Sequence, residues 1–325
     1  MKILVTSTFV TPFITQDLEL LGKHYDVEHL VGSGPRAPLS IARRVHMVDI
    51  VFVWFASTYA SAAVFAARRF GKRSLIAIGG ADVAAIPELG YGLWLSPWKS
   101  LLAGYALRNA DKVLAVDTSL MRLAARRAQY DGDNLEYLPT GFDAQFWTPE
   151  GEKEPFVLTV AVCDTEERLK VKGIDMLVET ARRRPEIPFR IVGIHDRLLP
   201  KLRASAPHNL TIQGRVERYE LRELYRRAKV YCQPSAFEGL PGAVCEAMLC
   251  GCVPVGTDVG GIATAMADVG FVVPYGDLGG LVYVIESALG ALPVQGEKAR
   301  ASIAGRFTME RREQGLLGVI EELSP

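Results

Sequence analysis

The chain has 325 residues, 49% of them hydrophobic, and its 37 basic and 37 acidic residues leave no formal net charge at pH 7. That length exceeds what one hydrophobic core usually serves, so we expect two domains. The balanced charge argues against a protein that holds nucleic acid by bulk electrostatic attraction. The five cysteines have no spacing typical of a zinc site, and we expect reduced thiols in a cytoplasmic protein.

Short apolar runs alternate with helix-like segments from the start of the chain. We predict strands over residues 3–5, 27–31, 49–55, 74–78 and 112–116, and helices over residues 13–21, 57–70 and 99–109. The stretch 50–67 has no charge, but polar residues divide it into a strand-like front and an alanine-rich back, which favours strand, turn and helix over a membrane span. Strands separated by helices imply a parallel, doubly wound α/β sheet with ligands at the carboxyl ends of its strands.

Two features of this first half have two interpretations each. Gly79-Gly80-Ala81-Asp82 follows a predicted strand, and Asp82 is either an acceptor contact or a helix N-cap. Residues 91–102 are rich in aromatic side chains and include Trp98 beside Lys99. They form either a loop that packs on the core or an acceptor lid with a shallow membrane-surface contact.

Proline, glycine and charged residues mark a linker over residues 138–154. We therefore divide the chain into a first domain over residues 1–149 and a second over residues 150–305, with a final helix within residues 306–325 that can pack back on the first domain. The second half repeats the alternation, with strands over residues 156–162, 189–192, 210–213 and 230–233 and helices over residues 173–184, 220–228 and 309–323.

The most informative stretch runs from Gln233 to Gly261. Its strand ends at Pro234, and we expect a helix to open within residues 239–242, with Pro241 at the first helical position, and to end at Gly251. The unbonded N–H groups at such a helix start, together with the positive end of its dipole, attract phosphate or hydroxyl-rich ligands.

Two carboxylates frame this helix start, because Glu238 lies just before it and Glu246 follows after seven intervening residues. A carboxylate accepts hydrogen bonds from two hydroxyls at once, which suits vicinal sugar diols. The structural alternative is that Glu238 is a helix-start charge and Glu246 a solvated helical residue.

Glu238-x7-Glu246, together with its flanks, resembles the signature of the retaining family 4 glycosyltransferases, in the glycogen phosphorylase/glycosyltransferase superfamily. The flanks are Pro234-Ser235 before it, and Gly251-Cys252-Val253-Pro254-Val255 and Gly260-Gly261 after it. The resemblance implies the GT-B fold, in which two doubly wound Rossmann-like domains face a central cleft. It also implies that Glu238 sits by the donor sugar and that Glu246 binds the nucleotide ribose.

The resemblance extends to Lys172-Gly173, which precedes a predicted helix. It implies that Lys172 neutralises the leaving diphosphate together with an arginine, a role for which Arg168 and Lys170 compete. The expected catalytic residues are thus Glu238, Lys172 and Arg168. Backbone near Arg215 is expected to meet the base, so the expected donor-binding residues are Gly239, Leu240, Pro241, Gly242, Glu246, Arg215 and Val216.

Two departures from the family pattern concern the acceptor side. Gly79 stands where many relatives have a histidine, and the loop over residues 6–11 lacks the glycine pair that is common after the first strand. We still expect Gly79, Gly80 and Asp82 to line the acceptor site.

The resemblance implies a metal-independent, retaining hexosyltransferase without a cofactor. Its co-substrate would be a nucleotide diphosphate sugar, UDP- or GDP-linked rather than ADP-linked, and its acceptor a carbohydrate, lipid-linked or small-molecule hydroxyl. Asp131-Gly132-Asp133 follows an arginine-rich helix instead of a strand, so we interpret it as a surface turn and not a metal site. Two alternatives remain open: a nucleotide-sugar 2-epimerase of the same architecture, and a non-catalytic scaffold that binds sugar nucleotides. We expect a cytoplasmic location. The aromatic stretch 91–102 also suggests peripheral contact with a membrane surface.

Overall fold

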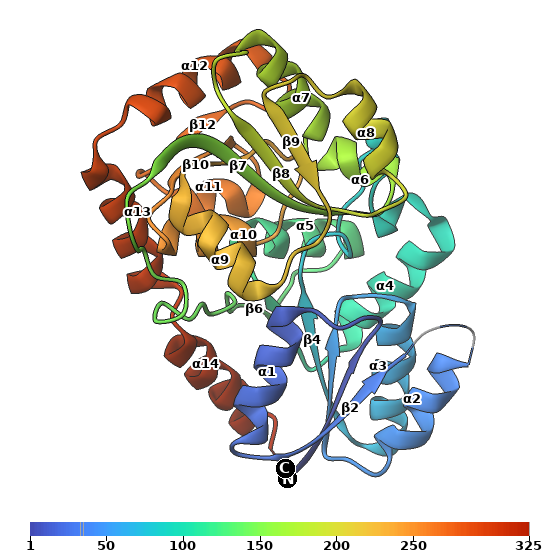
Figure 1. Ribbon diagram of the computed structural model, residues 1–325. Helices are drawn as coiled ribbons and strands as arrows, with labels where there is room; N and C mark the ends of the chain where they lie inside the picture. Colours follow the sequence, from blue (N-terminus) through green and yellow to red (C-terminus); the bar gives the residue numbers. More distant parts are fainter. Residues whose placement is uncertain (33, 35, 325) are drawn as a thin grey trace. The chain divides into compact units, whose positions relative to one another are not determined.

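Figure 1 shows the computed structural model, which describes residues 1–32, 34 and 36–324. Its contacts divide the chain into two compact units: unit 1 is Met1–Gly141 with Met309–Pro325, and unit 2 is Phe142–Thr308. The units therefore change at Gly141 and Thr308, whereas the sequence placed the boundaries at residues 149 and 305. Residue 325, the last of the region predicted to hold the final helix, lies outside the described residues.

Unit 1 is built on a parallel six-stranded sheet with the order β2-β1-β3-β4-β5-β6. Strand β3 is apolar and buried along its whole length, and β4 is buried from Ser74 onward, as expected of a sheet covered on both faces. The strands are β1 (Lys2–Ser7), β2 (Asp26–Val31), β3 (Ile50–Trp54), β4 (Arg73–Ile78), β5 (Lys112–Ala115) and β6 (Leu135–Tyr137).

Helices cover both faces of this sheet. They are α1 (Pro12–Gly22), α2 (Ala37–Val45), α3 (Thr58–Phe70), α4 (Pro97–Asn109), α5 (Thr118–Ala128) and α14 (Met309–Glu322), with short 3₁₀ turns η1 (Pro87–Leu89) and η2 (Leu93–Leu95). Right-handed crossovers put α2, α3 and α4 on one face, because these helices join strands in the same direction along the sheet. Helices α1 and α14 pack together on the other face (Figure 1). The strand, turn and helix predicted for the uncharged stretch 50–67 are confirmed by β3 and α3.

The final helix α14 is tied to unit 1 by a buried ion pair. Arg312 donates to both carboxylate oxygens of Asp17 on α1, at 2.9 and 2.6 Å, and also to the Leu138 carbonyl at 2.9 Å. Trp54 donates to the same carboxylate at 3.1 Å. Removing one partner of such a pair leaves an uncompensated buried charge, which typically costs ~3–5 kcal/mol.

Unit 2 repeats the plan with a second parallel six-stranded sheet, of order β12-β11-β10-β7-β8-β9. Its strands are β7 (Glu154–Cys163), β8 (Phe189–Ile194), β9 (Leu210–Gln213), β10 (Ala228–Gln233), β11 (Val253–Thr257) and β12 (Phe271–Val273). Its helices are α6 (Glu166–Val171), α7 (Ile174–Arg183), α8 (Leu199–Ser205), α9 (Arg218–Arg227), α10 (Gly242–Leu249), α11 (Gly260–Met266), α12 (Leu278–Gly290) and α13 (Pro293–Arg306). The α/β architecture of two doubly wound parallel sheets is the predicted one.

No single helix of the described residues is long and apolar enough to cross a membrane. Helices α12 and α13 pass that test as a pair on length and composition, with a bend of 103° between them.

Candidate active site

The candidate site lies where the strand order of unit 2 reverses. From β7 the chain builds β8 and β9 on one side, then returns to build β10, β11 and β12 on the other. The loops that follow the neighbouring strands β7 and β10 therefore leave the sheet in opposite directions, which is where doubly wound sheets bind ligands. The β7 loop leads through α6 to Lys172, and the β10 loop contains Glu238.

A close backbone contact holds these two loops together. Gly173 has a φ of +65°, and a Cβ there would lie 2.0 Å from the Pro234 carbonyl oxygen. The Ala236 amide also donates to the Val171 carbonyl at 2.7 Å. Only glycine allows this approach, so the Lys172-Gly173 pair places its lysine directly over the β10 loop.

Glu238 receives three hydrogen bonds on one carboxylate oxygen, Oε1. The donors are Lys172 Nζ at 2.6 Å, Ser235 Oγ at 2.8 Å and Gln233 Nε2 at 2.9 Å. Gln233 is itself held by the Tyr231 hydroxyl at 2.6 Å. These contacts fix the carboxylate in one orientation. Its other oxygen, Oε2, has no hydrogen bond within the described residues and remains available to a ligand hydroxyl.

The helix start beside Glu238 differs from the prediction in one detail. Helix α10 begins at Gly242, and Pro241 is the N-cap in extended backbone (φ −77°, ψ 104°), so this proline is not the first helical residue. It serves instead through its carbonyl, which accepts from the Val244 and Cys245 amides. Among the described residues, the amides of Gly239, Leu240, Gly242 and Ala243 donate no backbone hydrogen bond. They remain available for an anionic ligand.

Close packing also fixes the loop from its far side. A Cβ on Gly261, in the first turn of α11, would lie 1.7 Å from the Gly239 carbonyl oxygen. The Gly260-Gly261 pair of the sequence signature therefore lets a second helix start rest against the Glu238 loop.

Glu246 lies within α10 and is not a solvated helical residue. Burial raises its pKa to about 7, although the nearby Arg218 guanidinium and the hydrogen bond from Tyr225 act in the opposite direction. The Tyr225 hydroxyl lies 3.4 Å from Glu246 Oε2. A partly buried carboxylate with a raised pKa is a frequent mark of a functional site, and within the described residues no ion pair is recorded for Glu246.

Arg168 and Lys170, the two candidates for a second cation beside Lys172, have different surroundings. Arg168 pairs with Asp164 at 3.5 Å, and both Arg168 and Lys172 lie close enough to Cys163 to oppose the rise of its thiol pKa caused by burial. Lys170 lines a separate pocket with Asp175 and other side chains of α6, α7 and α8. Arg168 is thus the one that shares the carboxyl end of β7 with Lys172.

The predicted base contact lies away from this cluster. Arg215 and Val216 follow β9, the edge strand three positions from β10 in the sheet. Arg215 is exposed, and Val216 packs against the core. The structure brings neither into contact with Glu238 or Lys172.

The corresponding edge of unit 1 is aromatic. Phe55 follows β3 with a left-handed φ of 77°, a strained conformation for a bulky residue. Its ring stacks on Phe9 at 5.2 Å and meets Phe13 edge-on at 6.2 Å. A Cβ on Gly79 would lie 2.8 Å from Phe55 Cε1. A histidine at residue 79 therefore has no room unless Phe55 moves.

Asp82 holds this edge together from inside. Its carboxylate is buried and accepts from the amides of Ala56 at 3.0 Å, Gly80 at 2.7 Å and Gly79 at 3.2 Å. It is therefore not a helix N-cap, and it links the loops after β3 and β4. The Trp94 ring donates to the Asp82 carbonyl at 2.8 Å, so this part of residues 91–102 packs on the fold.

Several side chains of these sites escaped the sequence analysis. Gln233 and Ser235 were visible in the central motif, yet nothing in their spacing indicates that they orient Glu238. Arg218 stacks over Phe146 at 4.2 Å and acts electrostatically on Glu246. Phe9 and Phe55 have no sequence signal, because their pairing depends on the backbone turn at Phe55.

Comparison with known proteins assigns this geometry to a family. The family model described as glycosyl transferases group 1 matches residues 156–290, which includes Lys172, Glu238 and Glu246. This stretch of the chain belongs to the group 1 glycosyltransferases. The chain is 29% identical over 246 residues to the alpha-maltose-1-phosphate synthase of Mycobacterium tuberculosis, and 27% identical over 247 residues to that of Mycolicibacterium smegmatis. The first match covers 69% of this chain but only 61% of the relative.

Solved structures share the fold of this chain at low sequence identity. Anabaena HepE in complex with UDP-glucose aligns with a TM-score of 0.81 and 16% identity, over 99% of this chain and 100% of that one. Sucrose-phosphate synthase from Thermosynechococcus elongatus aligns with a TM-score of 0.79 and 14% identity, over 99% of both chains. These likenesses establish the GT-B fold.

Proposed function

We propose that the protein is a retaining hexosyltransferase that moves a sugar from a nucleoside diphosphate sugar to an acceptor hydroxyl. The observation that carries this proposal is the contact between Lys172 and Glu238 at the switch point of unit 2, beside the unbonded amides at the start of α10. A cation and free amides suit a diphosphate, and a fixed carboxylate with one free oxygen suits a sugar hydroxyl.

In the proposed reaction, the bond between the sugar C1 and the diphosphate oxygen breaks as the acceptor oxygen bonds to C1 on the same face. The acceptor proton passes to the departing diphosphate oxygen. Lys172, Arg168 and the amides of residues 239–243 stabilise the negative charge that develops there, which is usually the largest single contribution to such catalysis. Glu238 orients the sugar, and Glu246 accepts from the ribose hydroxyls.

We propose a UDP- or GDP-linked donor. The support is indirect: HepE, which shares the fold, was crystallised with UDP and with UDP-glucose. The acceptor is proposed to bind at the aromatic edge of unit 1, where Phe9 is about half exposed. Its class remains a carbohydrate, lipid-linked or small-molecule hydroxyl.

Donor turnover with and without acceptors tests the proposal. Thermal shift with UDP-, GDP- and ADP-sugars selects the donor, since a ligand at 100 times its dissociation constant stabilises by about 2.7 kcal/mol. Release of nucleoside diphosphate should then depend on an acceptor hydroxyl. Conversion of the donor without any acceptor would favour the 2-epimerase, and binding without turnover would favour the scaffold.

Metal independence is tested in the same assay. Because Lys172 supplies the positive charge at the proposed diphosphate site, turnover should survive excess EDTA. Complete loss of turnover that manganese restores would overturn this part of the proposal.

A further inference from the structure

The helices on one face of unit 1 carry basic residues and no carboxylate, although Arg44 of α2 pairs with Glu28 of β2 at 2.8 Å. Helices α2, α3 and α4 contain no Asp or Glu, and neither does α5, the next helix in the chain. The first three of these helices contain six basic residues: Arg43, Arg44, Arg68, Arg69, Lys99 and Arg108. On the other face of the same sheet, α1 and α14 do carry carboxylates, such as Asp17 and Glu313. The neutral chain thus has one basic helical face.

Large apolar side chains project from this face to solvent. Leu39 on α2 is 54% exposed, Phe65 on α3 63%, Trp98 on α4 60% and Leu101 on α4 69%. Helices α2 and α3 pack side by side, as do α3 and α4, so the residues belong to one continuous surface (Figure 1). Exposed apolar side chains in such a group mark an interaction site more often than isolated ones do.

Apolar and basic residues share the outward side of each helix. Phe65 lies three and four residues before Arg68 and Arg69, so that all three occupy the same side of α3. On α4, Leu101 follows Trp98 by three residues and Arg108 follows Leu101 by seven, which also puts them on one side of the helix. Lys99 also lies 5.6 Å from the Trp98 ring centre. Apolar side chains with Lys and Arg around them, Trp among them, are typical of helices that lie in a membrane interface.

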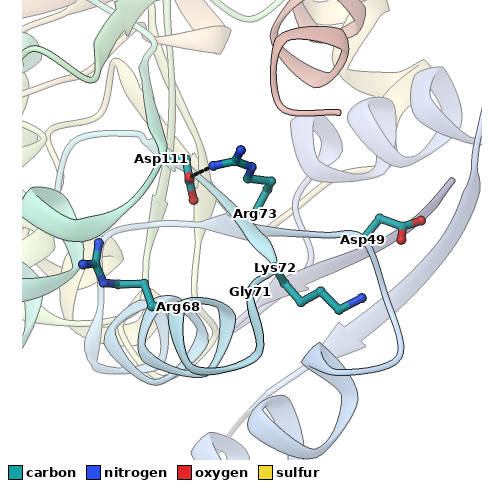
Figure 2. A pocket seen from close by; sticks show the side chains of 6 residues that line it. All are labelled: Asp49, Arg68, Gly71, Lys72, Arg73 and Asp111. Atoms are coloured by element: carbon teal, nitrogen blue, oxygen red, sulfur yellow. Dashed lines mark hydrogen bonds and ion pairs between the residues drawn. The ribbon is translucent and has the colours of Figure 1, made fainter. Parts of the chain in front are cut away.

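Figure 2 shows the end of α3, where three basic side chains lie near one another. A pocket there is lined by Asp49, Arg68, Gly71, Lys72, Arg73 and Asp111. Its two carboxylates already have partners within the protein: Asp111 accepts from Arg73 at 2.9 Å, and Asp49 accepts from the Lys2 amide at 2.8 Å. Within the described residues, Arg68 and Lys72 form no ion pair. Their charges are therefore available to an external anion.

We propose that the α2–α4 face, defined by Leu39, Arg43, Phe65, Arg68, Arg69, Trp98, Lys99 and Leu101, docks on an anionic lipid bilayer. The apolar side chains enter the interface, and the basic ones meet lipid phosphates. Charge complementarity selects this occupant, because a second copy of the chain would bring together two sets of helices that carry basic residues and no acidic ones. The face lies outside the proposed catalytic residues, so this inference does not depend on the proposed reaction.

Vesicle co-sedimentation of the whole protein tests the proposal. We expect binding to vesicles of phosphatidylcholine mixed with phosphatidylglycerol, and little binding to phosphatidylcholine alone. Binding should fall when salt is raised from about 0.1 M to about 0.5 M, since exposed charges are then screened within a few ångströms. Equal binding to neutral and anionic vesicles, or none to either, overturns the proposal.

Matched variants separate the two contributions. Arg68→Glu with Arg69→Glu should weaken binding to anionic vesicles at least about tenfold, because each basic residue near the surface contributes substantially to attraction. Arg182→Glu with Arg183→Glu is the control: this arginine pair also ends an exposed helix, but in unit 2 and beside Glu179. An equal loss in both double variants contradicts docking through α3.

Trp98→Ser with Leu101→Ser should likewise weaken vesicle binding, whereas Tyr283→Ser with Leu292→Ser, at equally exposed positions of unit 2, should not. Light scattering on the same proteins identifies the rival occupant. If the wild type is a dimer that the Trp98 and Leu101 substitutions convert to a monomer, the face joins two copies and the proposal is wrong.

Discussion

The carboxyl edges of the two sheets have the same backbone plan and opposite chemistry. In unit 2 the loops after the central strands bring Lys172, Glu238 and Gln233 together, and the partners fix the carboxylate. In unit 1 the loops after β1 and β3 bring Phe9 and Phe55 together, and the carboxylate Asp82 faces inward. The difference separates two tasks: one edge is prepared for a charged ligand, whereas the other offers only stacking area and backbone.

The sharpest test of this comparison removes Lys172, the cation at the carboxyl edge of the unit 2 sheet (the polar edge). Lys172→Ala should lower turnover by about 10²- to 10³-fold, the range observed when one group that stabilises developing negative charge is lost. Lys170→Ala is the matched control, since Lys170 is exposed and lines a different pocket. Steady-state kinetics decide, and equal losses would mean that the diphosphate does not lie at Lys172. Because Lys172 touches Glu238, the double variant with Glu238→Gln should lose less than the two single effects combined.

The two glutamates of the polar edge should separate by kinetic parameter. Glu238→Gln should reduce kcat, since it contacts the sugar that changes in the reaction, and Glu246→Gln should chiefly raise the donor KM. A hydrogen bond to a charged group is worth roughly 1.5–3 kcal/mol, so each change should be about ten- to a hundredfold. Loss of turnover at saturating donor in the Glu246 variant alone would reverse the assignment.

The close backbone contact between Gly173 and Pro234 can be tested separately. Gly173→Ala should destabilise the protein more than Gly151→Ala by about 1–3 kcal/mol, because both glycines have a left-handed φ but only Gly173 faces a carbonyl oxygen at 2.0 Å from the added Cβ. Nothing lies within 4 Å of a Cβ at Gly151. Thermal unfolding of the two variants measures the difference, and equal melting temperatures would show that the loops are free to separate.

The partly buried carboxylate Glu246 makes the polar edge sensitive to pH. Its pKa is about 7 in the folded protein and 4.5 ordinarily, so the folded state holds an extra proton between these values and stability falls as pH rises from 4.5 to 7. Ribose hydroxyls require the carboxylate, so donor affinity should weaken by up to about tenfold per pH unit below 7. Calorimetric titration across this range measures the slope. Glu246→Gln should remove it, and a persistent slope would identify another titrating group.

Substitutions at the carboxyl edge of the unit 1 sheet (the aromatic edge) should have small effects, limited to the acceptor KM. Phe9→Ala should raise the acceptor KM about two- to tenfold, since an aromatic contact is worth ~0.5–1.5 kcal/mol beyond its area, and should leave the donor KM unchanged. Phe70→Ala is a control on an equally exposed phenylalanine of the same unit, since both side chains are 48% exposed. A change in donor KM instead would place Phe9 near the nucleotide sugar.

Much of the fold and part of the site could be predicted, for identifiable physical reasons. The apolar strands and the Glu238-x7-Glu246 motif are local signals. Helix α6 was not predicted, although Thr165 caps it and Glu166 and Glu167 favour its first turn. The contact between Lys172 and Glu238 joins residues 66 apart and depends on the Gly173 contact, which no pattern encodes. The position of Phe55 could not be predicted either, because it depends on a backbone turn that places its ring against Gly79.

The buried pair of Arg312 and Asp17 imposes an order of events during synthesis. The two residues are 295 apart in sequence, so Asp17 leaves the ribosome long before its partner. Unit 2 is one continuous segment and can fold as soon as it emerges, as domains generally do. We infer that unit 1 completes its folding last, because Asp17, which also accepts from Trp54, can pair with Arg312 only after α14 has been synthesised. Pulse proteolysis of a chain ending at Thr308 tests this inference: unit 2 should resist cleavage while unit 1 is degraded, and equal resistance of both would contradict it.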